Sequence, residues 1–168
     1  MKVTKSLLIA ASILFPSLSQ AAPQCKVDHA EYVMTGRPDI TAGFRAIPHL
    51  KGWVSDVALY VDFHRTGQRY WFLFDQGSSH YITLISTDNV NAPSWSPPSA
   101  DGGHRPLGSM TYWSSKDGLT YPLVVPKNDQ EADKIILLPD LSEIMWYRAS
   151  PRVDVPTSAF MLRKCRAS

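Results

Sequence analysis

The segment VALYVDF at 57–63 places apolar side chains at alternate positions, with an alanine, a tyrosine and an aspartate between them. This two-residue period is typical of a half-buried β-strand. RYWFLF at 69–74 and HYITLIS at 80–86 are further predicted strands. The connecting segments HRTGQ and DQGSS each contain a glycine, which adopts positive φ at little cost, so both are predicted to be tight turns. The three strands are therefore expected to form an antiparallel meander.

Further strands are predicted toward the C-terminus. Their segments are LTYPLVV at 119–125, KIILL at 134–138, EIMWYRA at 143–149 and FMLRKC at 160–165. Pro122 in the first of them has no backbone N–H to donate, which indicates an edge strand or a bulge. Pro139 and Asp140 are expected to form a short turn between the second and the third. The last segment ends at Cys165 and is expected to be the closing strand.

Helical signals are few. NDQEADK at 128–134 has the polarity of one exposed helical turn. Asp140 and Glu143 have the spacing of a capping box, which would begin a short helix reaching Trp146. A strand is favoured there instead, because EIMWY is rich in β-forming residues and KIILL needs a partner strand.

The predicted fold class is all-β, a single domain of antiparallel hairpins and meanders. Thirteen prolines and regularly spaced turn signals agree with this class. A propeller-like body, a β-sandwich and a barrel all fit the pattern. SSKDGLTY at 114–121 is similar to the Asp-box turn of sialidase-type propeller blades, with one residue missing and tyrosine in place of tryptophan. An ordinary Lys-Asp-Gly hairpin turn is the favoured interpretation, because a single turn motif carries little information about a fold.

The segment 1–21 has the features of an export signal. Two lysines precede an apolar run at 7–18, and small residues follow it. We expect cleavage after Ala21, which leaves a single domain at 22–168 in the periplasm. The apolar run is shorter than the roughly 20 residues of a membrane span and is interrupted by Pro16, so no membrane anchor is expected after cleavage.

The chain that remains after cleavage is formally neutral. The whole sequence has 17 basic and 15 acidic side chains, and the export signal holds two of the lysines and no acid. A neutral surface without a run of Lys or Arg attracts nucleic acid and anionic lipid weakly, so neither is an expected partner. Cys25 and Cys165 are the only cysteines and lie near the two ends. An exported pair without a third thiol predicts a disulfide and one closed body.

The sequence contains no catalytic or metal-binding motif. The five histidines lack the close spacing of a zinc site, and the Gly-x-Ser-x-Gly pattern of a serine hydrolase is missing. Ser78 and Ser79 are neighbours of His80 on a hairpin, where adjacent side chains point to opposite faces and form no triad. Asp62 and His64 share a face, an arrangement more typical of a surface hydrogen bond. We therefore expect no enzyme activity, no metal and no cofactor.

The stretch SWSPPSADGGHRPLGSMTYW at 94–113 is expected to be an excursion from the β domain. Its prolines restrain the backbone, whereas a flexible linker is rich in Gly and Ser without such restraint. Trp95, Tyr112 and Trp113 bracket the stretch, and such rings are enriched at the centres of interfaces. Restrained loops also bind at a lower entropic cost. The alternative, favoured for Tyr112 and Trp113, is that the rings cover the end of the core.

These features resemble the periplasmic immunity proteins that Gram-negative bacteria keep against type VI secreted peptidoglycan amidases. The likeness lies in the layout of the mature chain and, in detail, only in HRPLGSM at 104–110. In that family a loop enters the amidase cleft, and a small polar residue meets the catalytic Cys/His pair. The resemblance implies that Ser109 is this residue and that the body is β-rich and propeller-like. The expected partner-binding residues are His104, Arg105, Gly108, Ser109, Met110, Tyr112 and Trp113.

Two other functions fit the sequence. A secreted carbohydrate- or peptidoglycan-binding module would use Trp53, Trp95 and Trp113 as stacking platforms. A small secreted hydrolase would use His64 or His80. The immunity function, with a cognate secreted amidase as the protein partner, is the principal expectation.

Overall fold

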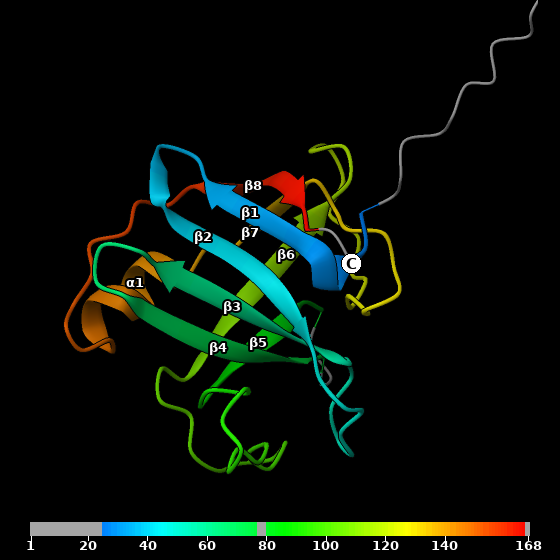
Figure 1. Ribbon diagram of the computed structural model, residues 1–168, viewed down its shortest axis with the longest axis vertical. Coiled ribbons are helices and arrows are strands. Elements are labelled where there is room, and N and C mark those ends of the chain that lie inside the picture. The colour runs from blue at the N-terminus through cyan, green and yellow to red at the C-terminus, as the bar shows by residue number, and fades with distance from the viewer. Residues whose placement is uncertain (1–24, 77–79, 167–168) are drawn as a thin grey trace, which may run out of the picture.

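The computed structural model describes residues 25–76 and 80–166, which form one closed antiparallel β-barrel (Figure 1). Each strand pairs with the next along the chain, and the last pairs with the first. The strands are β1 (Ala30–Met34), β2 (Arg37–Ala46), β3 (Val57–Phe63), β4 (Gln68–Asp75), β5 (Ile82–Thr87), β6 (Ser109–Ser115), β7 (Ile135–Leu137) and β8 (Ala159–Cys165). The all-β prediction is confirmed. The architecture is a barrel, so the propeller-like body and the sandwich are wrong.

Alternation along the strands fills the barrel with apolar side chains. Val57, Leu59 and Val61 of β3 point into the core, as their two-residue period predicts. The residues between them, Ala58 and Tyr60, belong to a second cluster on the outside of the barrel. This outer cluster consists of Ile47, Trp53, Ala58, Tyr60, Trp71, Leu73 and Ile85. The strands β3 to β5 are therefore buried on both faces, which explains the unbroken WFLF run of β4.

Several strand predictions are confirmed within a few residues, namely those for β3, β4, β5, β7 and β8. The strand expected at 119–125 is wrong, because these residues follow an irregular path and β6 pairs with β7 instead. The exposed helical turn expected at 128–134 is also wrong, since only a short turn forms there. The sequence interpretation did not include β1, β2 or β6.

The segment expected to be the strand EIMWYRA is instead the helix α1 (Leu141–Tyr147). The physical reason is the helical spacing of Leu141, Ile144 and Met145, whose side chains are all buried against the barrel core. KIILL gains its second partner strand from β8 rather than from the following segment. In Figure 1 the helix lies at one end of the barrel, away from the chain's C-terminus.

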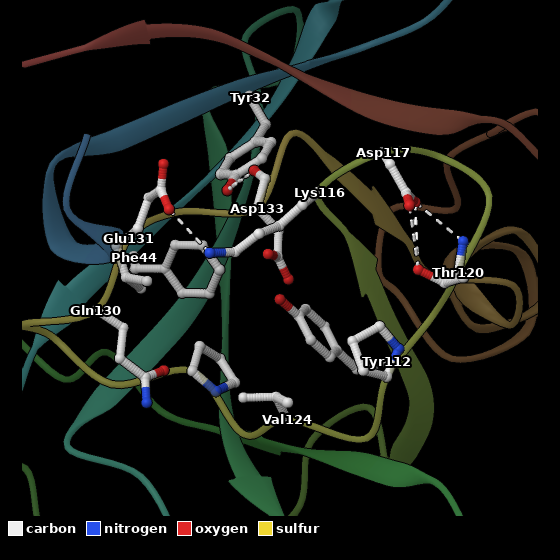
Figure 2. A pocket seen from close by; sticks show the side chains of 13 residues that line it. Tyr32, Phe44, Tyr112, Lys116, Asp117, Thr120, Val124, Gln130, Glu131 and Asp133 are labelled. Atoms are coloured by element: carbon white, nitrogen blue, oxygen red, sulfur yellow. Dashed lines mark hydrogen bonds and ion pairs between the residues drawn. The ribbon is translucent and has the colours of Figure 1, made fainter. Parts of the chain in front are cut away.

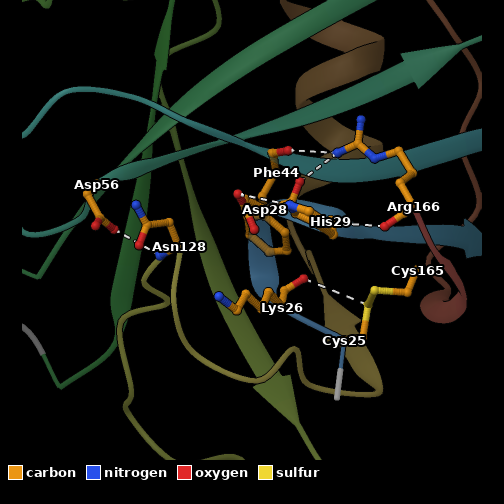
Figure 3. A network of polar contacts seen from close by, with 9 residues as sticks. All are labelled: Cys25, Lys26, Asp28, His29, Phe44, Asp56, Asn128, Cys165 and Arg166. Atoms are coloured by element: carbon orange, nitrogen blue, oxygen red, sulfur yellow. Dashed lines mark hydrogen bonds and ion pairs between the residues drawn. A yellow bond between two sulfur atoms is a disulfide. The ribbon is translucent and has the colours of Figure 1, made fainter. Parts of the chain in front are cut away.

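The opposite end of the barrel carries the first and last described residues, Cys25 and Arg166, and the short helix η1 (Val27–His29). The predicted disulfide between Cys25 and Cys165 is confirmed, with Cα atoms 5.5 Å apart. Beside it, the guanidinium of Arg166 donates hydrogen bonds to the carbonyl oxygens of Asp28 at 2.8 Å and Phe44 at 3.2 Å (Figure 3). These contacts bind η1 to the end of β2 and fix this rim of the barrel.

The predicted export signal at 1–21 and its predicted cleavage after Ala21 lie outside the described residues. Among the residues that are described, no helix has both the length and the apolar character needed to cross a membrane. The disulfide is compatible with an exported protein.

Candidate functional site

A cavity of about 540 Å³ opens at the barrel end that carries the disulfide (Figure 2). We call it the mouth cavity, and we call the stretch 116–134, which runs across this end between β6 and β7, the mouth segment. The lining residues are Val27, Tyr32, Phe44, Tyr112, Lys116, Asp117, Thr120, Pro122, Val124, Pro126, Gln130, Glu131 and Asp133. The cavity therefore lies between the barrel interior and the mouth segment.

Aromatic rings from the barrel interior wall the mouth cavity. Tyr32 of β1 and Tyr112 of β6 occupy inward positions of their strands, and each is almost fully buried. Phe44 of β2 packs edge-on against Tyr32, with ring centroids 5.9 Å apart. Tyr112 packs edge-on against Phe74, with centroids 5.0 Å apart. Burial raises the pKa of both tyrosine hydroxyls, so the two phenols are neutral at physiological pH.

A carboxylate lies between these tyrosines. In Figure 2 the carboxylate of Asp133 and the hydroxyl of Tyr112 point toward one another. The hydroxyl of Ser114 donates to Oδ2 of Asp133 at 2.5 Å, and the hydroxyl of Tyr32 donates to the backbone carbonyl of Asp133 at 2.7 Å. The hydrogen bonds hold Asp133 in place at the inner edge of the mouth segment.

The mouth segment is fastened on both sides. On one side, the hydroxyl of Ser55 donates to the carbonyl of Pro126 at 2.6 Å, and the N–H of Asn128 donates to the carboxylate of Asp56 at 3.0 Å (Figure 3). On the other side, the N–H of Ala132 donates to the carbonyl of Cys25 at 2.7 Å, next to the disulfide. These bonds hold the segment across the end of the barrel.

An ion pair lies at the rim of the mouth cavity. Nζ of Lys116 is 2.8 Å from Oε2 of Glu131, and Figure 2 shows the lysine side chain extending toward this carboxylate. The hydrogen bond that the ammonium of Lys116 donates to the carboxylate of Glu131 raises the pKa of Lys116. Both side chains are well exposed, so the pair contributes little to stability.

The motif SSKDGLTY at 114–121 spans the end of β6 and the start of the mouth segment, and it forms a turn. Asp117 accepts hydrogen bonds from the N–H groups of Leu119 and Thr120, while the hydroxyl of Ser115 accepts one from the N–H of Gly118. The expected Lys-Asp-Gly hairpin is wrong, because the chain after this turn forms no adjacent strand with β6. A blade of a propeller is also excluded by the barrel.

The residues predicted to bind a partner lie on two sides of one strand. Because β6 alternates, Ser109 and Trp113 face outward, whereas Met110 and Tyr112 face the core. Met110 is 3% exposed and Tyr112 is 2% exposed. Their prediction as partner-binding residues is therefore corrected, and for Tyr112 the alternative of covering the core is the right one. The stretch expected to be a loop to residue 113 ends at residue 108.

The loop 88–108 contains the other predicted residues. His104 is exposed, with Nδ1 3.5 Å from the carboxylate of Asp88. The guanidinium of Arg105 donates to the carbonyl of Ala100 at 2.8 Å within the loop. Gly108 has a φ of +77°, a conformation that strains any other residue, and it lies against the guanidinium of Arg148. His104, Arg105 and Gly108 therefore lie in the last part of the loop, directly before Ser109. Contacts within the loop hold this part in place.

The residues of the alternative functions are not gathered into a site. Trp53 is buried in the outer cluster, and Nε1 of Trp95 donates to the hydroxyl of Thr87 at 3.0 Å. They therefore do not form an open stacking platform with Trp113. Nε2 of His64 lies 3.0 Å from the hydroxyl of Thr41, and within 25–76 and 80–166 no ion pair joins His64 to a carboxylate. Across 25–76 and 80–166, no three His, Cys, Asp or Glu side chains are grouped so as to hold a metal ion.

The mouth cavity was missed by the sequence interpretation. The sequence signal was that Tyr32 and Tyr112 occupy inward-facing positions of alternating strands. This signal could not be used, because the strands β1 and β6 were not predicted. Comparisons with protein-family models, with curated proteins and with solved structures gave no match to this chain.

Proposed function

We propose that this protein is a periplasmic immunity protein, an exported inhibitor that binds a cell-wall-degrading amidase. The observation that carries the proposal is the outer face of β6, defined by Ser109, Thr111 and Trp113, which presents a serine at the start of the strand and a tryptophan further along the same face. Backbone pairing with β5 and β7 holds this face in one conformation. A preformed surface binds with little loss of conformational entropy.

Exposed aromatic rings support a protein partner. The side chain of Trp113 is 42% exposed, and its ring centroid lies 6.4 Å from that of Tyr121, which is 37% exposed. Trp113 also borders a shallow pocket of about 320 Å³ formed with residues of β7, the following turn and the segment before β8. Tryptophan and tyrosine dominate the binding energy of many protein interfaces, especially where a pocket adjoins them.

Ser109 is the residue proposed to meet the amidase active site. It is exposed at the first position of β6, directly after the loop 88–108. The loop end is fixed by the N–H of Leu107, which donates to the hydroxyl of Ser86 at 2.9 Å, and by Arg148, which donates to the carbonyl of Leu107 at 3.1 Å. A serine hydroxyl both donates to and accepts from a Cys/His pair, so inhibition would be steric and competitive.

The test is co-purification with a candidate amidase, sought as a small exported Cys/His enzyme encoded by a neighbouring gene, followed by inhibition assays. Ser109→Arg places a long cation on the outer face of β6 and should abolish inhibition. Ser109→Ala removes at most one or two hydrogen bonds and should weaken binding by about 1 to 3 kcal/mol.

The matched control is Thr66→Arg, which adds the same side chain to the exposed β3–β4 turn, outside both β6 and the pocket beside Trp113. This variant should inhibit like the parent. Full inhibition by Ser109→Arg would show that the outer face of β6 is not the contact surface.

A further inference from the structure

We propose that the mouth cavity binds a small organic cation, namely an amine with an apolar body. The site is separate from the outer face of β6, because its lining lies at the disulfide end of the barrel and includes none of Ser109, Thr111 and Trp113. The inference therefore stands or falls independently of the amidase.

The dimensions and walls of the cavity suit a small amphiphilic molecule. Its volume of about 540 Å³ lies in the usual range of about 300 to 1,000 Å³ for small-molecule sites. An eight-stranded barrel is wide enough either to be filled by side chains or to hold one small ligand. Here the α1 end is filled, and the opposite end is left open above Tyr32, Phe44 and Tyr112.

The charges of the lining side chains favour a ligand with a positive charge. Four lining side chains are formally charged, the acids Asp117, Glu131 and Asp133 and the base Lys116. Lys116 is already paired with Glu131 at the rim. The remaining charge is negative, and the side-chain hydrogen bond to the carboxylate of Asp133 comes from the neutral hydroxyl of Ser114. An anionic ligand would be repelled by this lining.

The aromatic rings in the cavity wall also favour a positively charged ligand. Aromatic ring faces attract an ammonium group, most strongly where water is excluded. Phe44, Tyr32 and Tyr112 are buried rings grouped around the carboxylate of Asp133, as Figure 2 shows. An ammonium near Asp133 would gain an ion pair and ring contacts, while the apolar body would contact Val27, Pro122 and Val124.

The experiment is titration calorimetry of the full protein with matched probes that share a phenyl body and differ in the head group. The probes are 2-phenylethylamine, 2-phenylethanol and 3-phenylpropionate. The amine should bind at least about tenfold more tightly than the alcohol, and the carboxylate should show no binding. Equal affinity for the alcohol, tighter binding of the carboxylate, or no binding of the amine at millimolar concentration would each overturn the proposal.

Two pairs of variants locate the binding. Val124 lines the cavity and is 49% exposed, whereas its neighbour Leu123 is 46% exposed and does not line it. Val124→Trp should therefore block the amine, while Leu123→Trp should leave its affinity unchanged. Asp133→Asn should reduce amine affinity at least about tenfold, and the control Asp129→Asn, at an exposed position outside the lining, should not. Equal effects within either pair would place the binding elsewhere.

Discussion

The carboxylate of Asp117 shows how one side chain organises a turn without a strand partner. It accepts hydrogen bonds from the N–H of Thr120 at 3.0 Å, from the N–H of Leu119 at 2.8 Å and from the hydroxyl of Ser115 at 3.0 Å. These donors favour the ionised form and lower the pKa of Asp117 from 3.8 to about 2. The start of the mouth segment is therefore held by an ionised carboxylate.

We predict that Asp117→Asn lowers the melting temperature at neutral pH and that the difference from the parent shrinks as pH falls from about 4 to about 2. A group whose pKa is lower in the folded state stabilises the fold above its unfolded pKa, and this contribution is lost as pH falls through the folded pKa. Scanning calorimetry of both proteins over this pH range measures the difference.

Asp39 has a similarly lowered pKa because of its hydrogen bonds from Arg37, but it is present in both proteins and cancels in the comparison. A temperature difference that does not change over this pH range would contradict the assigned role of Asp117.

The neighbours Ser109 and Met110 show that alternation along a strand decides whether a single residue faces the solvent or the core. The sequence placed them in one binding motif, yet Ser109 is exposed and Met110 is buried. Adjacent residues of a strand point to opposite faces, so a motif of consecutive residues cannot all meet one partner. The same alternation separates Trp113 from Tyr112.

The helix α1 illustrates how burial outweighs local propensity. β-forming residues favoured a strand here, but Leu141, Ile144 and Met145 bury one helical face against the end of the barrel. The free energy of that burial exceeds the small propensity differences between helix and strand. The element type was therefore decided by the barrel end that it covers.

We predict that Met145→Ala lowers the free energy of unfolding by about 2 to 5 kcal/mol, because the side chain is fully buried and its removal leaves a cavity. Urea unfolding measures the change. Tyr147→Ala, at a position 71% exposed on the same helix, should change it by no more than about 0.5 kcal/mol. Similar small losses for both variants would mean that α1 does not close the barrel end.

Closure of the whole barrel depends on the pairing of β1 with β8, and the disulfide lies at the end of that seam. Ala30 is the register partner of Cys165, and the bond joins residues separated by 140 positions. In the chain-entropy model a loop of this length stabilises the fold by up to about 5 kcal/mol. The same bond anchors the segment at Cys25 that holds Ala132 of the mouth segment.

We predict that the double variant Cys25→Ser with Cys165→Ser still folds but unfolds at a lower urea concentration, with a loss of up to about 5 kcal/mol. Affinity for the amine probe should fall as well, because the mouth segment loses its anchor. Reductant added to the parent should reproduce both effects and leave the double variant unchanged. An unchanged unfolding midpoint in the variant would show that the seam holds without the bond.

The sequence by itself determined the all-β class, five of the strands and the disulfide pair. Period-two alternation, turn glycines and the count of cysteines are local or compositional signals, so they need no knowledge of the partners in space. The closure of the sheet, the helical state of Leu141–Tyr147 and the mouth cavity were decided only by the tertiary structure. Each depends on contacts between segments distant in the chain, such as Tyr32 with Asp133, and local patterning does not encode which segments meet.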